Sequence, residues 1–211
     1  MKFTQIPANT FKEIVLNAGI VVDSFVPSTK VIGNIIGATS GGVNFTATPT
    51  YTDYGDDIDN CPKNMMELKK LDSWETIRLT GTLLTVTAAT AKRLVSAADI
   101  DDDDDTHIIP RNDVLSGDFT DVWWVGDYSD KNEGSTAGFC AIHLKNTLNT
   151  SGFQIQSGDK AKGTFPFEFT AHYSMEAQDE VPFDIYVQAG TGTGGGSTGG
   201  GATGGGTGTG N

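Results

Sequence analysis

The residues best suited to chemistry are two clusters of carboxylates. Asp99 and the unbroken run 101–105 form one cluster, and residues 53–59 hold the other. Carboxylate oxygens can bind Ca²⁺, but an EF-hand loop interleaves its ligands with other residues around a glycine and ends on a glutamate. The run 101–105 lacks that spacing, so we expect a solvated loop whose charges repel one another. For residues 53–59 we likewise favour a polar loop that follows a strand over a metal site.

The other chemically capable side chains form no recognisable catalytic or metal-binding pattern. His107, His143 and His172 are widely spaced, whereas a zinc site needs three or four ligands in a tetrahedral array. The sequence has no G-x-S-x-G elbow, no cysteine with a neighbouring base and no Gly-Lys-Ser phosphate loop. We therefore expect no catalytic, cofactor-binding or metal-binding residues, and we expect that the protein is not an enzyme.

The charge balance of the chain is strongly acidic. The 211 residues carry a formal net charge of −13, which excludes binding nucleic acid through neutralised phosphates, because that requires clustered Lys and Arg. An acidic protein can still surround nucleic acid without gripping it. No run reaches the roughly 18 apolar residues of a membrane-spanning helix, and the N-terminus lacks the apolar core of a signal peptide. We expect a soluble protein, made inside the cell, with no membrane partner.

Two regions of different composition divide the chain. Residues 1–189 contain the apolar and charged side chains, and residues 190–211 are almost entirely Gly, Thr, Ser and Ala. The second region cannot form a core and is expected to be a flexible tail, either a surface fringe, a tether or a solubilising appendage. Within the first region Cys61 and Cys140 are the only cysteines, and we expect buried thiols rather than a disulfide.

The dominant period of the folded region is two. Residues 43–52 alternate apolar side chains with asparagine and threonine, so a strand there would present one apolar and one threonine-lined face. Pro49 lacks an N–H donor and indicates a sheet edge, a bulge or a strand end. Residues 165–174 place three phenylalanines, Ala171 and Tyr173 on one face, which predicts a strand with one buried face.

Further segments predict additional strands. They are residues 13–25, broken at Asn17-Ala18-Gly19, and residues 75–86, 121–128, 139–145, 152–156 and 183–188. We expect 139–145 and 152–156 to pair as a hairpin. Trp123 and Trp124 are adjacent, so on a strand they face opposite ways, and only one of them can enter the same core. The other must be covered or exposed, and exposed apolar surface usually marks a partner.

The sequence predicts a single convincing helix. Residues 88–98 place Ala91, Leu94, Val95 and Ala98 along one stripe, and Thr87 can cap the start. Residues 62–71 form either a short second helix, with Pro62 in its first turn, or an ordered loop. Many strands with one helix predict a mainly β protein, a sandwich or barrel with a flanking α-helix.

Two stretches resemble the major tail proteins of bacteriophages with long, non-contractile tails. One stretch runs through residues 38–64 and 72–75 and begins ATSGGVNFTATPTYTDY; the other is FPFEFTAHYSM at 165–175, followed by VPFDIYV at 181–187. The resemblance covers most of residues 11–189 in order and spacing. It implies a tail-tube-like β-sandwich or half-barrel with one packed α-helix on its outer side and a long inter-strand loop.

The resemblance also implies a structural function in the virion. Subunits would join edge to edge into a ring, usually a hexamer, whose inner sheet lines a channel, and stacked rings would conduct DNA during ejection without binding it specifically. In that family a long loop or hairpin between early strands reaches the adjacent ring, and residues 53–74 match its position. The candidates for this inter-ring contact are Tyr54, Asp56, Asp57, Asp59 and Trp74.

The expected partners are therefore further copies of this chain and other phage tail proteins. The protein would be made in the bacterial host cytoplasm and reside in the phage tail. Closing a ring removes open strand edges, which otherwise promote aggregation. The alternative reading is a monomeric β-sandwich module that binds a host receptor or a glycan through exposed Trp and Tyr side chains.

Overall fold

A computed structural model describes residues 6–7, 10–128 and 136–190 of the chain. Strands dominate it. The elements in chain order are α1 (Thr10–Glu13), β1 (Val15–Val22), β2 (Phe25–Val26), β3 (Val31–Ile32), β4 (Thr39–Asp53), the 3-10 turn η1 (Met66–Leu68), β5 (Lys69–Leu83), α2 (Ala88–Val95), β6 (Ala98–Ile100), β7 (Ile108–Pro110), η2 (Ser116–Asp118), β8 (Thr120–Tyr128), β9 (Phe139–Asn149), β10 (Phe165–Thr170) and β11 (Phe183–Gln188).

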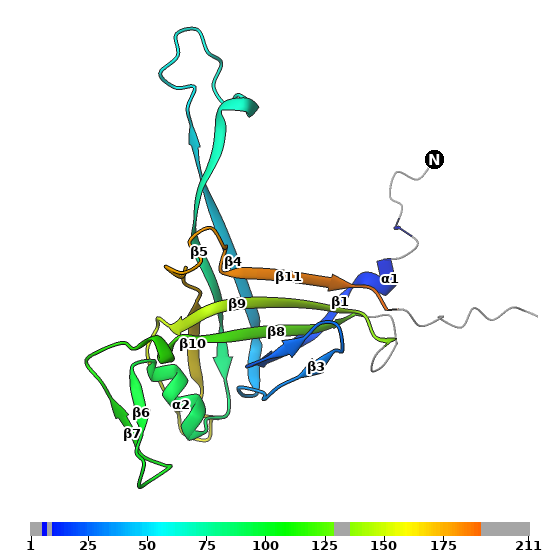
Figure 1. The fold of residues 1–211 in the computed structure, drawn as a ribbon. Helices are drawn as coiled ribbons and strands as arrows, with labels where there is room; N and C mark the ends of the chain where they lie inside the picture. The colour runs from blue at the N-terminus through cyan, green and yellow to red at the C-terminus, as the bar shows by residue number, and fades with distance from the viewer. Residues whose placement is uncertain (1–5, 8–9, 129–135, 191–211) are drawn as a thin grey trace, which may run out of the picture.

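A single curled sheet forms the body. Its strands follow the order β1-β8-β9-β10-β5-β4, with β11 added beside β9, and every pairing is antiparallel. The curvature brings the two ends of the sheet toward each other and makes a half-barrel (Figure 1). The predicted fold class, mainly β with one packed helix and a half-barrel sheet, is confirmed.

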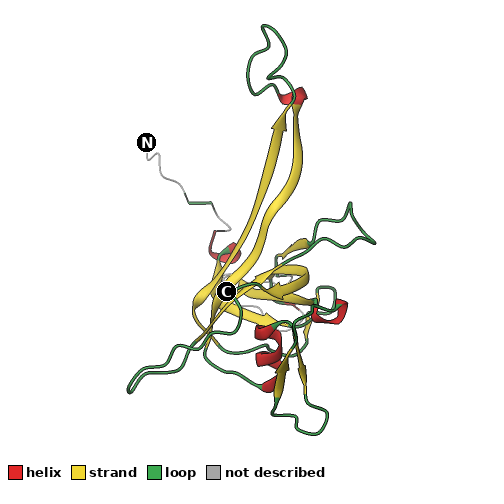
Figure 2. Cartoon of the chain, turned by 90° about the vertical axis from the view of Figure 1, so that its left-hand side faces the viewer, coloured by secondary structure: helices red, strands yellow, loops and turns green. Residues whose placement is uncertain are grey.

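Strands β4 and β5 make a long hairpin that projects from the body. They pair from Thr39 opposite Leu83 to Asp53 opposite Lys69, and the far half extends well beyond the other strands (Figures 1 and 2). We call residues 49–74 the arm. The strand predicted at 43–52 is confirmed, and Pro49 lies at a bulge on β4, which pairs only with β5 within the described part of the chain.

The inner face of the curled sheet holds the main core. Phe165, Phe167 and Phe169 on β10 are buried and alternate with half-buried positions, as the period of two predicts. They pack with aliphatic side chains from β5, β8 and β9 and with Leu94 of α2. Strand β10 ends at Thr170, however, and Tyr173 is exposed, so the predicted buried face stops at Ala171.

Helix α2 closes one end of this core. Thr87 caps it by accepting a hydrogen bond from the backbone N–H of Thr90 at 3.2 Å, as predicted. Leu94 is fully buried. The helix ends at Val95 rather than at residue 98, because Ser96 adopts a positive φ of 70° and Ala98 already begins strand β6. No described helix is both long and apolar enough to cross a membrane.

The predicted hairpin of 139–145 with 152–156 was wrong. Residues 152–156 form no strand and are joined to Thr164 only by an isolated bridge at Gln156, whereas β9 pairs with β8 and β11 over 139–144. Of the two alternatives for residues 62–71, the α-helix is excluded: the segment is a loop with the 3-10 turn Met66–Leu68, followed by the start of β5. The loop at the end of the arm is therefore shorter than predicted, because β5 begins at Lys69.

Both adjacent tryptophans are covered within the chain. Trp123 is buried and stacks on His143, while Trp124 packs against the main core and donates a hydrogen bond to the Ala18 carbonyl at 2.9 Å. The Trp124 ring fits because Gly126 lies beside it: a Cβ there would stand 2.5 Å from the ring. Neither tryptophan therefore supplies the exposed apolar surface that was considered because the two residues are adjacent in the sequence. Cys61 and Cys140 are free thiols, as predicted, but both are half-buried.

Candidate assembly interface

The loop at the end of the arm is held by its own hydrogen bonds. The Asp53 carboxylate accepts from the backbone N–H of Gly55 and of Asn64, each at 3.0 Å. The backbone N–H of Tyr54 donates to the Leu68 carbonyl at 3.0 Å, which closes the loop across the two strands. We call residues 54–68 the arm tip. Its geometry is set by the hairpin itself, far from the body of the sheet (Figure 2).

The arm tip holds four of the five residues proposed for an inter-ring contact. Asp56, Asp57 and Asp59 are exposed, and the Tyr54 side chain is 61% exposed with the Lys70 ammonium 5.8 Å from its ring centre. Trp74 differs from them. It lies at the base of the arm on β5 and packs edge-on against Phe183, with ring centres 5.1 Å apart, so its side chain already has a partner within the chain.

The arm has two chemically different faces. Tyr51 on β4 lies directly opposite Leu71 on β5, and these apolar side chains are 58% and 49% exposed. On the other face Thr50 lies opposite Ser73, and their hydroxyl oxygens are 3.0 Å apart. The apolar face has no cover within the described part of the chain, which makes it a candidate contact surface for another molecule.

Among the described strands β11 pairs with β9 alone, which leaves its other edge open. It pairs with β9 along one side, and the backbone N–H of Lys145 donates to the Pro182 carbonyl at 2.9 Å. Hydrogen-bonded pairs alternate along an antiparallel ladder, so the N–H groups of Ile185 and Val187 point away from β9. Their side chains are exposed too. By contrast, the outer edge of β1 is partly closed, because Val21 and Asp23 bond the segment 34–36.

The acidic run forms the loop of the small β6–β7 hairpin. The Asp101 carboxylate accepts a hydrogen bond from the backbone N–H of Asp103 and pairs with His107 at 3.0 Å. Both contacts lower the pKa of the Asp101 carboxyl below its ordinary value. Asp99 instead pairs with Arg111 at 2.7 Å. Among the described residues, no group of three or more His, Cys, Asp or Glu side chains is arranged to hold a metal ion.

A partly exposed polar cluster surrounds His143 and was not predicted from the sequence. The imidazole stacks on Trp123, with ring centres 4.0 Å apart, and lies 2.8 Å from an oxygen of Asp121. Asp184 contacts Lys145 at 3.0 Å, and Lys145 also donates to Glu180, a hydrogen bond that raises the pKa of the lysine ammonium. These contacts tie β8, β9 and β11 together. No sequence spacing signals them, because the partners come from distant strands.

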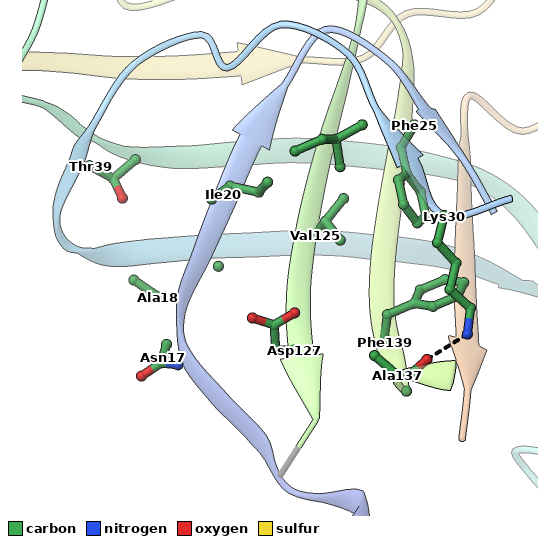
Figure 3. Close-up of a pocket in the computed structure, with 13 residues that line it drawn as sticks. Asn17, Ala18, Ile20, Phe25, Lys30, Thr39, Val125, Asp127, Ala137 and Phe139 are labelled. Carbon is green, nitrogen blue, oxygen red and sulfur yellow. Dashed lines mark hydrogen bonds between the residues drawn. The ribbon is translucent and has the colours of Figure 1, made fainter. Parts of the chain in front are cut away.

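A cavity of about 550 Å³ opens beside strand β1 (Figure 3). Ile20, Val125 and Phe139 supply apolar lining, and Asp127 lies at its lower side. The Lys30 ammonium points toward the Ala137 carbonyl and donates to it at 2.6 Å. The described lining contains no His or Cys, and its charged side chains are Lys30 and Asp127.

Comparison with protein-family models and with curated protein sequences gave no match.

Proposed function

We propose that this protein is the subunit of a bacteriophage tail tube, which assembles into stacked rings that conduct DNA. The observation that carries the proposal is the arm: a two-stranded hairpin that leaves the body and exposes the apolar pair Tyr51 and Leu71. An isolated two-stranded hairpin is marginally stable in water. An arm of this length therefore gains most from packing on another molecule.

A further copy of the chain is the partner that fits best. The resemblance to major tail proteins assigns this position to a contact between adjacent rings, and the arm tip extends far enough from the body to reach a neighbouring molecule (Figure 2). The open edge of β11 supports lateral contact, since unpaired N–H groups at a strand edge can pair with a strand of the next subunit. Together, an axial arm and a lateral edge support the two contact directions that a tube requires.

The rival function, a monomeric module that binds a receptor or a glycan, is less well supported. That reading relied on exposed Trp and Tyr side chains as stacking platforms. Trp123 is buried, and Trp74 and Trp124 are half-buried against the main core. The exposed aromatic residues of the arm, Tyr51 and Tyr54, are available to either function, but their place on a projecting hairpin favours assembly.

Replacement of the arm tip tests the proposal. A variant in which an Asn-Gly turn replaces residues 54–68 keeps β4 and β5 joined, because this dipeptide favours a tight hairpin. Negative-stain electron microscopy should show hollow tubes for the intact chain and, for the variant, single rings or smaller particles. The matched control shortens the β6–β7 loop, residues 101–107, and should still form tubes.

Two results would contradict the proposal. Intact chains that yield only small, featureless particles at high concentration would remove the tube altogether. Tubes that form equally well without the arm tip would show that the arm serves another purpose. Circular dichroism of each variant verifies that the sheet is retained before either result is interpreted.

A further inference from the structure

The side of strands β4, β5 and β10 that faces away from the core is rich in threonine. The pairing sets Thr80 between Asn44 and Glu168, and Arg78 between Thr46 and Thr170. We call this surface the threonine face. Its members, as far as the base of the arm, are Asn44, Thr46, Thr48, Thr50, Ser73, Thr76, Arg78, Thr80, Thr82, Pro166, Glu168 and Thr170. Further along the arm, the same side continues with Thr52 and Lys70, which are outside the surface so defined.

The threonine face is electrically neutral in a chain of net charge −13. Its charged members, Arg78 and Glu168, pair with each other at 3.2 Å. The Thr150 hydroxyl, at the edge of the face, lies 3.0 Å from a Glu168 oxygen and 2.8 Å from the Thr170 hydroxyl. The charges and many of the hydroxyls of this surface are therefore already satisfied within the subunit.

The threonine face does not have the composition of a protein–protein contact. The centre of such a contact is depleted in charge and enriched in large apolar and aromatic side chains. None of the exposed large hydrophobic residues in the described chain belongs to this face; Tyr51 and Leu71 lie on the reverse side of the same hairpin. The two sides of the hairpin are thus suited to different environments, one to protein and one to water.

The helix and the acidic loop lie on the opposite side of the sheet. Leu94 of α2 packs into the core with Phe167 and Phe169, whose side chains point away from the threonine face. The β6–β7 hairpin follows α2 directly and contacts it, so Asp103 and its neighbours lie on the helix side (Figure 1). Neutral and acidic surfaces are therefore separated by the core.

We infer that the threonine face is the wall of the channel and that duplex DNA passes along it. This inference rests on the proposed tube. Clustered cations would hold phosphates by counterion release, and a dense acidic lining would raise the energy of a polyanion inside the channel. A neutral hydroxyl surface retains a layer of water. It neither binds phosphates nor repels the polyanion, so the duplex can slide along it.

Cysteine accessibility in assembled tubes tests the inference. Thr80→Cys places a thiol at the centre of the threonine face, and Asp103→Cys places a matched thiol on the helix side. Each variant is treated with a small maleimide and with a bulky polyethylene-glycol maleimide, before and after assembly, and peptide mapping separates the new thiol from Cys61 and Cys140. Thr48→Cys, on the same face, replaces Thr80→Cys if that variant fails to assemble.

The expected pattern distinguishes a channel from other surfaces. On assembly the thiol at position 80 should keep its reaction with the small reagent and lose it with the bulky one, while the thiol at 103 keeps both. Loss of both reactions at position 80 would make the face a contact between copies, and retention of both would place it outside the tube; either result overturns the inference while leaving the tube intact. If the unmodified chain forms no tubes, the proposed function fails first.

The Arg78–Glu168 pair gives a second readout. Glu168→Gln leaves the Arg78 guanidinium unpaired in the channel, so tubes of this variant should retain a labelled duplex at low salt and release it at high salt. Unmodified tubes and the double variant with Arg78→Gln should retain none above background. Equal retention by all three kinds of tube would contradict a wall formed by this face.

Discussion

At the scale of single residues, Asp23 shows how one carboxylate positions a connecting segment. Partial burial raises the pKa of this group, but hydrogen bonds from the side chain and backbone of Asn34, both at 2.8 Å, outweigh the burial and lower it below 3.8. These bonds hold the segment 34–36 against the edge of β1. A carboxyl group whose pKa is lower in the folded chain than in the unfolded chain stabilises the fold at pH values above its ordinary pKa. This contribution is lost as the pH falls through the folded-state pKa.

The pH dependence of Asp23→Asn follows from that sign. The variant should have a lower free energy of unfolding than the unmodified chain at neutral pH, and the difference should shrink once the pH is below the folded-state pKa of Asp23. Urea unfolding at a series of pH values measures it. A difference that stays constant across the series would show that the ionised carboxylate is not what stabilises this contact.

Burial separates residues that stabilise the subunit from residues that assemble it. Phe169 is almost wholly buried in the main core, so Phe169→Ala should lower the free energy of unfolding by about 3–5 kcal/mol. Tyr51→Ala should change it by less than about 0.5 kcal/mol, as exposed substitutions usually do, yet reduce tube formation. Chemical denaturation and electron microscopy of both variants test this division. A large loss of stability in Tyr51→Ala would mean that the arm packs on its own subunit.

At the scale of elements, the N-cap of α2 tests whether the helix depends on local signals. Thr87→Ala removes the acceptor for the Thr90 N–H and should destabilise the protein by about 1 kcal/mol. Thr87→Ser retains the hydroxyl and should lie close to the unmodified chain. Thermal unfolding of both variants, followed by circular dichroism, measures the difference. Equal losses would assign the effect to the methyl group rather than to the cap.

The open edge of β11 can be tested without disturbing its ladder to β9. Proline at position 187 removes an N–H that points outward, so Val187→Pro should leave the subunit folded and prevent lateral pairing. Val187→Thr keeps the N–H with a similarly branched side chain and should still assemble. Sedimentation velocity distinguishes the variants. If Val187→Pro assembled normally, β11 would not be the lateral contact.

Some elements were predictable because their signal is local. The alternation at Phe165–Thr170 and Phe183–Gln188 and the apolar stripe behind Thr87 each place a strand or helix correctly. The β5 side of the arm, residues 69–74, was not predictable by the same rule. Bulges between Thr48 and Pro49 and between Thr50 and Tyr51 insert extra residues on β5, which destroys the period of two across residues 69–74.

Contacts between strands that are distant in the chain were also not predictable from the sequence. The pairing of residues 139–145 with 152–156 looked natural because the segments are neighbours, yet β9 takes β8 and β11 as partners. Four of the proposed inter-ring residues lie together at the arm tip: Tyr54, Asp56, Asp57 and Asp59. Their place was predictable because the polar composition of residues 53–59 indicates a loop. Trp74 was assigned to the loop because no local sequence signal predicts the bulge that directs its side chain toward the core.

At the scale of the whole molecule, assembly must overcome electrostatic repulsion. Each chain carries a net charge of −13, and ring closure brings several such chains together. Salt shortens the range of this repulsion from about 10 Å at 0.1 M to about 3 Å at 1 M. Added salt should therefore accelerate tube formation, as measured by light scattering after dilution from low salt. Faster assembly at low salt would mean that attractive charge pairs drive the contacts.

The central claim is that the chain hides the apolar side of its arm and its open strand edge by joining other copies of itself. Sedimentation of the purified full-length chain over a wide range of protein concentrations and salt concentrations tests it most directly. We predict ring-sized and larger species whose fraction rises with both variables. A single species of monomer mass under every condition would contradict the account.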